Sequence, residues 1–315
     1  MIEVRDLTKL FAGRPAVDGI TFSVGRGEVV GFLGPNGAGK STTMRILSSF
    51  MPATSGTARI GGFDVFFEPD EVRRRIGYMP ESNPLHLDMR VREYLRFRAR
   101  LKGLGWRRSR ERVETVLQQC GLVGVHKRII GQLSKGYRQR VGLADTLVHE
   151  PDLIILDEPT IGLDPHQIRS VRSLIKELGK TTTILLSTHI LPEVEMTCGR
   201  VLILNQGRIL ADDTTANLER TLSLDGQVVA EISAPGQSLK EAWRDTPEIE
   251  RWDISPMDGT WSRVSLTPKN GFDLRPLVFE VVREHGWDLR ELGRSRHSLE
   301  DIFIHLTRGK KAEER

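Results

Sequence analysis

The stretch that decides the fold is Gly27-Glu28-Val29-Val30-Gly31-Phe32-Leu33-Gly34-Pro35-Asn36-Gly37-Ala38-Gly39-Lys40-Ser41-Thr42. Its first part, Gly27–Leu33, is a short apolar run of the kind that forms a buried strand. Met44, Ile46 and Leu47 follow at the spacing of a helix. Strand, G-x-x-x-x-G-K-S and helix succeed one another in the order of a phosphate-binding loop (P-loop).

The chemistry of this loop suits a nucleoside triphosphate. Its glycines let successive backbone N–H groups point at phosphate oxygens, and the following helix adds the positive end of its dipole. Lys40 would neutralise charge on the β- and γ-phosphates, and Ser41 would place its hydroxyl on Mg²⁺. The candidate ATP-binding residues of the loop are Gly34, Pro35, Asn36, Gly37, Ala38, Gly39, Lys40, Ser41 and Thr42. The alternative is a chance match in a glycine-rich loop, which the flanking strand and helix disfavour.

A second apolar run, Leu153–Leu156, ends in the adjacent carboxylates Asp157 and Glu158. Runs of this length and composition are typical of buried strands in parallel sheets. Two acids at the end of such a strand are costly unless a cation or a reaction needs them. We therefore assign Asp157 to the Mg²⁺ shell and Glu158 to polarising the attacking water. The alternative is a pair of strand-terminating acids at a surface turn.

The base of the nucleotide is indicated by an absence in the sequence. A P-loop with a Mg²⁺-binding acid also occurs in GTPases and small-molecule kinases, and GTPases use Asn-Lys-x-Asp to recognise guanine. None of the five asparagines of this chain precedes a lysine. Adenine is therefore the better prediction, and ATP with Mg²⁺ is the expected cofactor pair.

Further motifs follow in order, and through them the chain closely resembles the ATP-binding cassette (ABC) ATPases. Leu133-Ser134-Lys135-Gly136-Tyr137 resembles the family's signature loop, commonly LSGGQ, and Ile161-Gly162-Leu163-Asp164 resembles its D-loop. Gly77-Tyr78-Met79-Pro80-Glu81 resembles the Q-loop, except that Glu81 stands where glutamine is usual. Phe11 occupies the place of the adenine-stacking aromatic, and His189 that of the switch histidine.

The resemblance implies a role for each of these residues. Glu158 and His189 would be the catalytic residues, with His189 touching the γ-phosphate. Without the other motifs, His189 would be interpreted as a histidine at a strand end whose hydrogen bonds are satisfied and which has no catalytic role. Ser41, Glu81 and Asp157 would form the metal site. The signature residues Ser134, Lys135, Gly136 and Tyr137 would contact ATP held by a second cassette, with Asp164 in the D-loop beside them. Tyr137 could be packing only, and a homodimer is expected.

The narrower resemblance is to cassettes of the gliding-motility, multidrug-exporter and nitrous-oxide-reductase-maturation type. It implies an ATP-hydrolysing subunit of an ABC-2 type exporter that works on a separate membrane permease, at the cytoplasmic face of the cell membrane. The alternative is a soluble ABC ATPase that acts on ribosomes or DNA. Only one motif set is present, and about ninety residues separate the P-loop from the signature, which disfavours that alternative. We expect no nucleic acid partner.

Composition agrees with a packed cytosolic protein. The chain has 315 residues, 38% of them hydrophobic, and a net charge of +4 from 46 basic and 42 acidic side chains. No run approaches the ~20 apolar residues of a spanning helix. Cys120 and Cys198 belong to no metal-binding pattern, so we expect buried free thiols. Arg90–Arg112 is strongly basic, and the spacing of its apolar residues, Leu101 included, predicts one amphipathic helix whose basic face is solvated or docks on a partner.

Two domains are expected. Residues 1 to about 220 would form an α/β P-loop domain of ABC type: a RecA-like core, an antiparallel β subdomain and a helical subdomain at about 84–150. Residues 222–315 would form a small accessory α+β domain, because their pattern predicts the ferredoxin-like order β-α-β-β-α-β. A capped amphipathic helix is predicted at Ser298–Leu306. Four tryptophans in this half, Trp243, Trp252, Trp261 and Trp287, are expected in the core.

Overall fold

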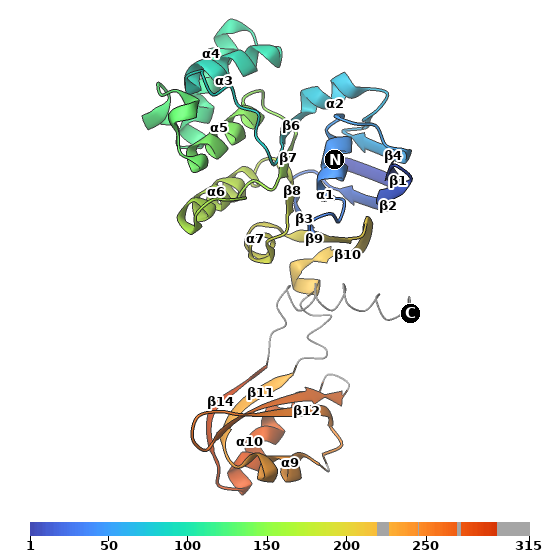
Figure 1. The fold of residues 1–315 in the computed structure, drawn as a ribbon, viewed down its shortest axis with the longest axis vertical. Helices are drawn as coiled ribbons and strands as arrows, with labels where there is room; N and C mark the ends of the chain where they lie inside the picture. The colour runs from blue at the N-terminus through green and yellow to red at the C-terminus, as the bar shows by residue number, and fades with distance from the viewer. Residues whose placement is uncertain (219–226, 245, 270–271, 295–315) are drawn as a thin grey trace. The chain divides into compact units, whose positions relative to one another are not determined.

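The computed structural model of the chain describes residues 1–218, 227–244, 246–269 and 272–294. The chain divides into two compact units, Met1–Thr214 and Thr215–Arg315, and each is described by itself (Figure 1). The first unit contains every motif named above.

A largely parallel sheet forms the centre of the first unit, with strand order β10-β9-β3-β8-β7-β6. Its strands are β3 (Val29–Leu33), β6 (Ile76–Met79), β7 (Leu153–Asp157), β8 (Thr183–Thr188), β9 (Arg200–Asn205) and β10 (Arg208–Thr214). All pairs are parallel except β9 with β10. Every residue of β7 and β8 is buried, as continuous apolar strands in parallel sheets require. The carboxyl ends of β3 and β7 therefore meet at one edge, which brings the P-loop beside Asp157.

A second, antiparallel sheet lies beside the first in the same unit (Figure 1). It has the order β2-β1-β4-β5, with β1 (Ile2–Phe11), β2 (Arg14–Val24), β4 (Ser55–Ile60) and β5 (Phe63–Asp64). The helices that accompany the two sheets are α1 (Lys40–Leu47), α2 (Pro69–Arg75), α6 (Pro165–Leu178) and α7 (Leu191–Thr197). Val4 and Phe22 of the antiparallel sheet share one core with Phe32 of β3 and Met44 of α1. This core fixes α1, and with it the P-loop, between the sheets.

A helical part stands between β6 and β7 and corrects one prediction. It contains α3 (Val91–Leu101), α4 (Trp106–Gln119), the short 3-10 turns Val123–Val125 and Ile130–Gln132, and α5 (Lys135–Leu147). The single helix predicted for Arg90–Arg112 is wrong, because the chain turns between α3 and α4 at Gly103, whose φ is +86°. Leu101, expected on the buried face, is 63% exposed because it lies in the last turn before that break.

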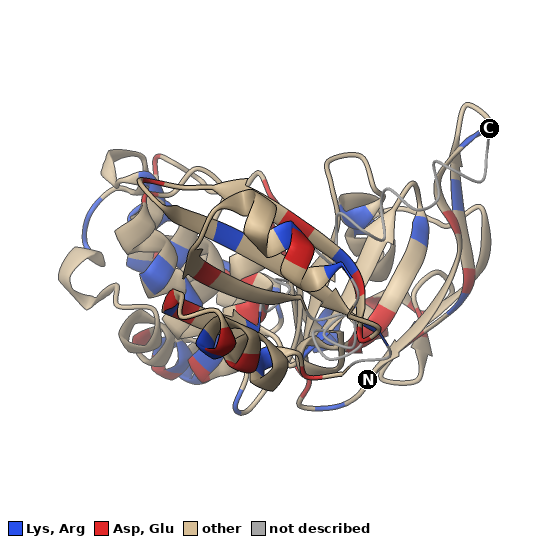
Figure 2. Cartoon of the chain, turned by 90° about the horizontal axis from the view of Figure 1, so that it is seen from below, with Lys and Arg blue, Asp and Glu red and all other residues tan. Residues whose placement is uncertain are grey.

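Many arginines of this basic stretch are paired within the helical part. Arg98 contacts the buried carboxylate of Asp145 on α5 at 2.8 Å, and the Tyr94 hydroxyl donates to the same carboxylate at 3.2 Å. Arg108 reaches Glu150 at 2.7 Å. Over the chain as a whole, Figure 2 shows both acidic and basic positions on the ribbon. Part of the basic charge therefore ties the helices together.

The second unit has the order of elements that the sequence predicts. Its elements are β11 (Val228–Ser233), α9 (Gly236–Trp243), β12 (Ile249–Pro256), β13 (Trp261–Pro268), α10 (Arg275–Glu284) and β14 (Asp288–Arg294). The strands pair antiparallel in the order β12-β13-β11-β14, the split β-α-β arrangement of ferredoxin-like domains. Trp243 is buried in its core, but Trp252 is 37% exposed on the edge strand, contrary to the prediction. The helix predicted at Ser298–Leu306 lies outside the described residues.

Two other expectations concern the chain as a whole. Cys120 and Cys198 are both buried and free, as predicted. Within the described ranges, no helix combines the length and the apolar character that crossing a membrane demands.

Candidate nucleotide-binding and hydrolysis site

The P-loop is shaped by two glycines in the left-handed region. Gly37 has φ +81° and Gly39 has φ +104°. A Cβ at Gly39 would also lie 2.4 Å from the carbonyl oxygen of Ala16, so a side chain is excluded there by space as well as by conformation. Helix α1 begins at the next residue, Lys40, and no acidic residue occupies its first turn. The positive end of the helix is therefore open to an anion.

Lys40 is buried and is held by the loop itself. Its ammonium donates to the carbonyl oxygens of Gly34 at 2.8 Å and Pro35 at 3.2 Å. It also lies 3.5 Å from the carboxylate of Glu158. The lysine that would meet phosphate is thus already inside the loop and paired with the acid at the end of β7.

Asp157 and Ser41 meet at the same edge of the sheet. The Ser41 hydroxyl donates to Asp157 at 3.1 Å, and the Ser187 hydroxyl of β8 donates to the same carboxylate oxygen. Burial raises the pKa of Asp157 above its ordinary value, because the ionised carboxylate is removed from water. Hydroxyl and carboxylate oxygens are ligands that Mg²⁺ prefers, and a cation would relieve the cost of this buried charge. The residues present therefore fit Mg²⁺.

A cavity of 430 Å³ opens over these groups. Its walls are formed by Phe11, Ala16, Asn36, Gly37, Gly39, Lys40, Ser41, Thr42, Glu81, Glu158 and Ile161. Phe11 is 47% exposed at one wall, where an aromatic ring can stack on a base. Glu81 adds a carboxylate to the wall. In the described part of the chain, no group of three or more His, Cys, Asp or Glu side chains is placed to hold a metal.

Glu158 and His189 are in contact. Nδ1 of His189 lies 2.9 Å from one carboxylate oxygen of Glu158, and the other oxygen faces Lys40. The backbone of Glu158 has φ +49°, an unusual conformation for a non-glycine residue, and its N–H donates to the carbonyl of Ser187 at 3.1 Å. Such a held carboxylate at a phosphate cavity can act as a general base.

The signature loop lies outside this cavity, and the D-loop borders it through Ile161 but not through Asp164. None of Ser134, Lys135, Gly136 and Tyr137 lines it, although all four belong to the same unit. Ser134 is the N-cap of α5, and Tyr137 stacks beside Arg140. Asp164 is the N-cap of α6 and accepts the N–H of Gln167 at 2.9 Å. The structure thus joins the P-loop, Asp157, Glu158, Glu81, Phe11 and His189 in one place but leaves the signature apart.

Three residues at the site were not predicted. Ala16 and Ile161 line the cavity, and Ser187 supports Asp157. Ser187 could have been found, because it follows the apolar run of β8 two residues before His189, and parallel strands align their carboxyl ends. Ala16 carries no such signal, since a small apolar residue in a strand is usually core.

The fold and this site together define a P-loop nucleotide-binding protein. The model of the ABC transporter family matches residues 17–161. Over 97% of the chain and 92% of the relative, the sequence is 36% identical to a daunorubicin/doxorubicin resistance ATP-binding protein of Streptomyces peucetius. It is 33% identical to a bacitracin transport ATP-binding protein of Bacillus licheniformis, over 98% of both chains. The chain belongs to the ABC transporter ATP-binding proteins, and it is an ATPase that uses ATP and Mg²⁺.

Solved structures agree. An ATP-binding subunit of an ABC transporter superposes with a TM-score of 0.64 at 34% identity, covering 70% of this chain and 93% of that one. A dimeric bacterial ABC transporter cassette superposes with a TM-score of 0.62 at 25% identity, over 68% of this chain and 98% of that one. The P-loop and ABC-type fold predicted from the sequence are therefore confirmed.

Proposed function

We propose that this chain is the ATP-hydrolysing subunit of an ABC-2 type exporter of drugs or antibiotics. Two copies would work on a separate permease at the cytoplasmic face of the cell membrane. The observation that carries the proposal is likeness along the whole chain, second unit included, to resistance and transport ATP-binding proteins. A likeness limited to the cassette would not have indicated what kind of molecule the transporter moves.

The residues of the site divide the chemistry among them. Backbone N–H groups of Gly37–Ser41 and the start of α1 would hold the phosphates, with Phe11 against the base. Lys40 would exchange the carbonyls of Gly34 and Pro35 for phosphate oxygens. Ser41, Asp157 and Glu81 would hold Mg²⁺, which supplies charge neutralisation at the phosphates when bound.

Glu158 would accept the proton of the attacking water, and His189 would position it. Since His189 contacts one carboxylate oxygen, the ring restricts the rotation of the carboxyl group and leaves the second oxygen toward the cavity. In the nucleotide-free chain that second oxygen faces Lys40 at 3.5 Å. Binding of phosphate would draw Lys40 away and release this oxygen for the water.

A second cassette would complete each site. The signature residues do not line the nucleotide cavity of their own chain, yet Ser134 and Gly136 begin a 13-residue helix whose first turn contains no acid. The γ-phosphate held by another chain is the anion that this end would bind. Pairing by two-fold symmetry then produces two equal sites.

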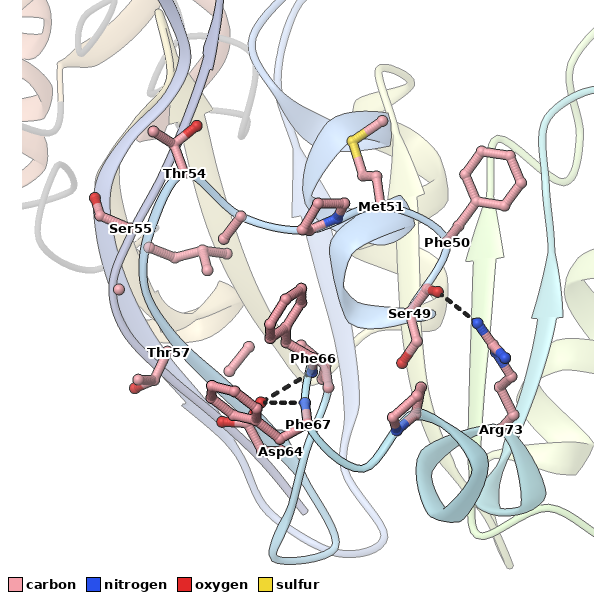
Figure 3. A pocket seen from close by; sticks show the side chains of 17 residues that line it. Ser49, Phe50, Met51, Thr54, Ser55, Thr57, Asp64, Phe66, Phe67 and Arg73 are labelled. Carbon is pink, nitrogen blue, oxygen red and sulfur yellow. Dashed lines mark hydrogen bonds between the residues drawn. The ribbon is translucent and has the colours of Figure 1, made fainter.

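The permease would meet an apolar surface as well as the helical part. A second cavity, of 520 Å³, is lined by Phe66, Phe67 and Arg73, which Figure 3 shows around it together with the segment that follows α1. Phe50, Phe66 and Phe67 are 74%, 60% and 79% exposed. Exposed aromatic side chains beside an arginine are typical of protein contact surfaces.

Purification from the native host tests this proposal. The full chain carrying Glu158→Gln and an affinity tag would be isolated from detergent-solubilised membranes with ATP and Mg²⁺. We expect to recover a stoichiometric polytopic membrane protein. The yield of that protein should be lower with Phe67→Ser than with the control Phe279→Ser, which changes another exposed ring, in α10. Loss of the gene should sensitise cells to a drug or peptide antibiotic. Recovery with ribosomes or DNA, and no membrane protein, would overturn the proposal.

A further inference from the structure

Lys135 is the first residue of α5, at a position where the family's signature loop commonly has glycine. It is exposed and does not line the nucleotide cavity of its own chain. Among the residues that the structure describes, no hydrogen bond or ion pair engages its ammonium. A lysine at the positive end of a helix is electrostatically unfavourable, and Arg138 in the same turn adds to the positive charge.

The ammonium of Lys135 lies against the D-loop of its own chain. A Cβ added at Gly162 would be only 2.1 Å from Nζ of Lys135, so the space above Gly162 is filled by this side chain. Gly162 also has φ +67°, which favours glycine. The next signature residue, Gly136, packs as closely against Gln167 at the start of α6, where a Cβ would lie 2.6 Å from the side-chain carbon. Signature loop and D-loop therefore form one packed unit.

The same lysine lines a cavity together with the Q-loop position. A space of 530 Å³ is lined by Lys135, Arg138 and Glu81, with Ile161 of the D-loop at its wall. Glu81 and Ile161 also line the nucleotide cavity. Lys135 thus lines the same cavity as the carboxylate of Glu81, and a second chain would bring a phosphate to the signature loop that contains this lysine.

We propose that Lys135 is a positioning residue that makes hydrolysis in its own chain depend on the nucleotide held by the second chain. The γ-phosphate bound at Ser134 and Gly136 would draw the ammonium away from Gly162. The D-loop begins three residues after Glu158, so a shift at Gly162 is transmitted through a short segment to the general base. The inference rests on the proposed pairing of two cassettes.

The test compares Lys135→Met, which keeps the aliphatic stem and removes the charge, with Lys135→Arg. The control is Lys180→Met, which changes an exposed lysine just beyond the end of α6. Fluorescent ATP binding to dilute single chains should be unchanged within twofold in all three. We expect Lys135→Met to weaken ATP-dependent pairing about ten- to hundredfold in sedimentation experiments, as for one lost charged contact. Its pairing should also depend less on salt.

Hydrolysis is the second measurement. The hydrolysis rates of wild type, Lys135→Arg and Lys180→Met should depend on ATP concentration with a Hill coefficient near two. The Hill coefficient of Lys135→Met should fall toward one. A Lys135→Met protein that pairs, responds to salt and hydrolyses ATP cooperatively like wild type would overturn the inference while leaving the proposed function intact. A wild type that neither pairs nor shows cooperativity would instead overturn the pairing of cassettes, and the inference with it.

Discussion

Replacing Glu158 by glutamine tests the site most directly, because one carboxylate there has two partners. Its oxygens lie 3.5 Å from Lys40 and 2.9 Å from His189, and both Lys40 and Glu158 are buried. The amide of Glu158→Gln keeps the shape and the contact with His189. It removes the negative charge and the proton acceptor.

The expected magnitudes follow from these contacts. A positioned general base contributes about 10²- to 10⁴-fold, so kcat should fall by roughly that factor, on the order of 3–5 kcal/mol in the barrier. At 3.5 Å and an effective dielectric constant of about 20, the gross attraction between Glu158 and Lys40 is on the order of 5 kcal/mol. If about a third of that becomes available to phosphate, ATP should bind about tenfold more tightly.

Phosphate release and binding of a fluorescent ATP analogue measure the two effects separately. Size-exclusion chromatography with light scattering would then show whether the ATP-bound variant accumulates as a pair. Glu177→Gln, an exposed change on α6, is the matched control and should behave as wild type. A kcat of Glu158→Gln within about threefold of wild type would refute the role of this carboxylate, and unchanged ATP affinity would refute the competition for Lys40.

Three further substitutions probe the P-loop, the buried carboxylate and the packing of the helical part. Lys40→Ala should lower ATP affinity at least about tenfold in a binding titration, because a charge-assisted contact with phosphate is lost; an unchanged isotherm would contradict the P-loop assignment. Asp157→Asn should raise the melting temperature of the nucleotide-free chain at pH 7. Burial raises the pKa of Asp157 above the ordinary value of 3.8 for this carboxyl group, so its ionisation destabilises the folded chain as the pH rises above 3.8. Below that pH the carboxyl group is protonated, and the gain in melting temperature from Asp157→Asn should vanish. If the gain persisted in acid, the buried charge would not be its cause. Gly142→Ala should cost about 1–3 kcal/mol in denaturant unfolding, because its Cβ would lie 1.7 Å from the Asn83 amide. Gly124→Ala, with open space around it, is the control, and equal effects would contradict the packing argument.

Local sequence determined the elements that form the candidate site. The strand, P-loop and helix at 27–47 were predictable because glycine conformation, an apolar strand and a helix start are all encoded within about twenty neighbouring residues. Asp157 and Glu158 were predictable for a related reason, since acids at the end of a buried strand require a partner. The order of elements in the second unit also followed from periodicity alone.

Tertiary structure alone decided what these groups touch. The chain turns between α3 and α4, so the basic stretch forms two helices and not one. Arg98 in this stretch forms an ion pair with Asp145, which lies forty-seven residues away in the sequence. The contact of Lys135 with Gly162 joins two loops that are separated in the sequence. Ser187 reaches Asp157 only because β8 lies beside β7. Sequence specifies such features through long-range packing, which no local pattern records. The residues of the candidate site were therefore predictable from neighbouring residues, whereas the packing of the signature loop against the D-loop arises from the way distant segments meet.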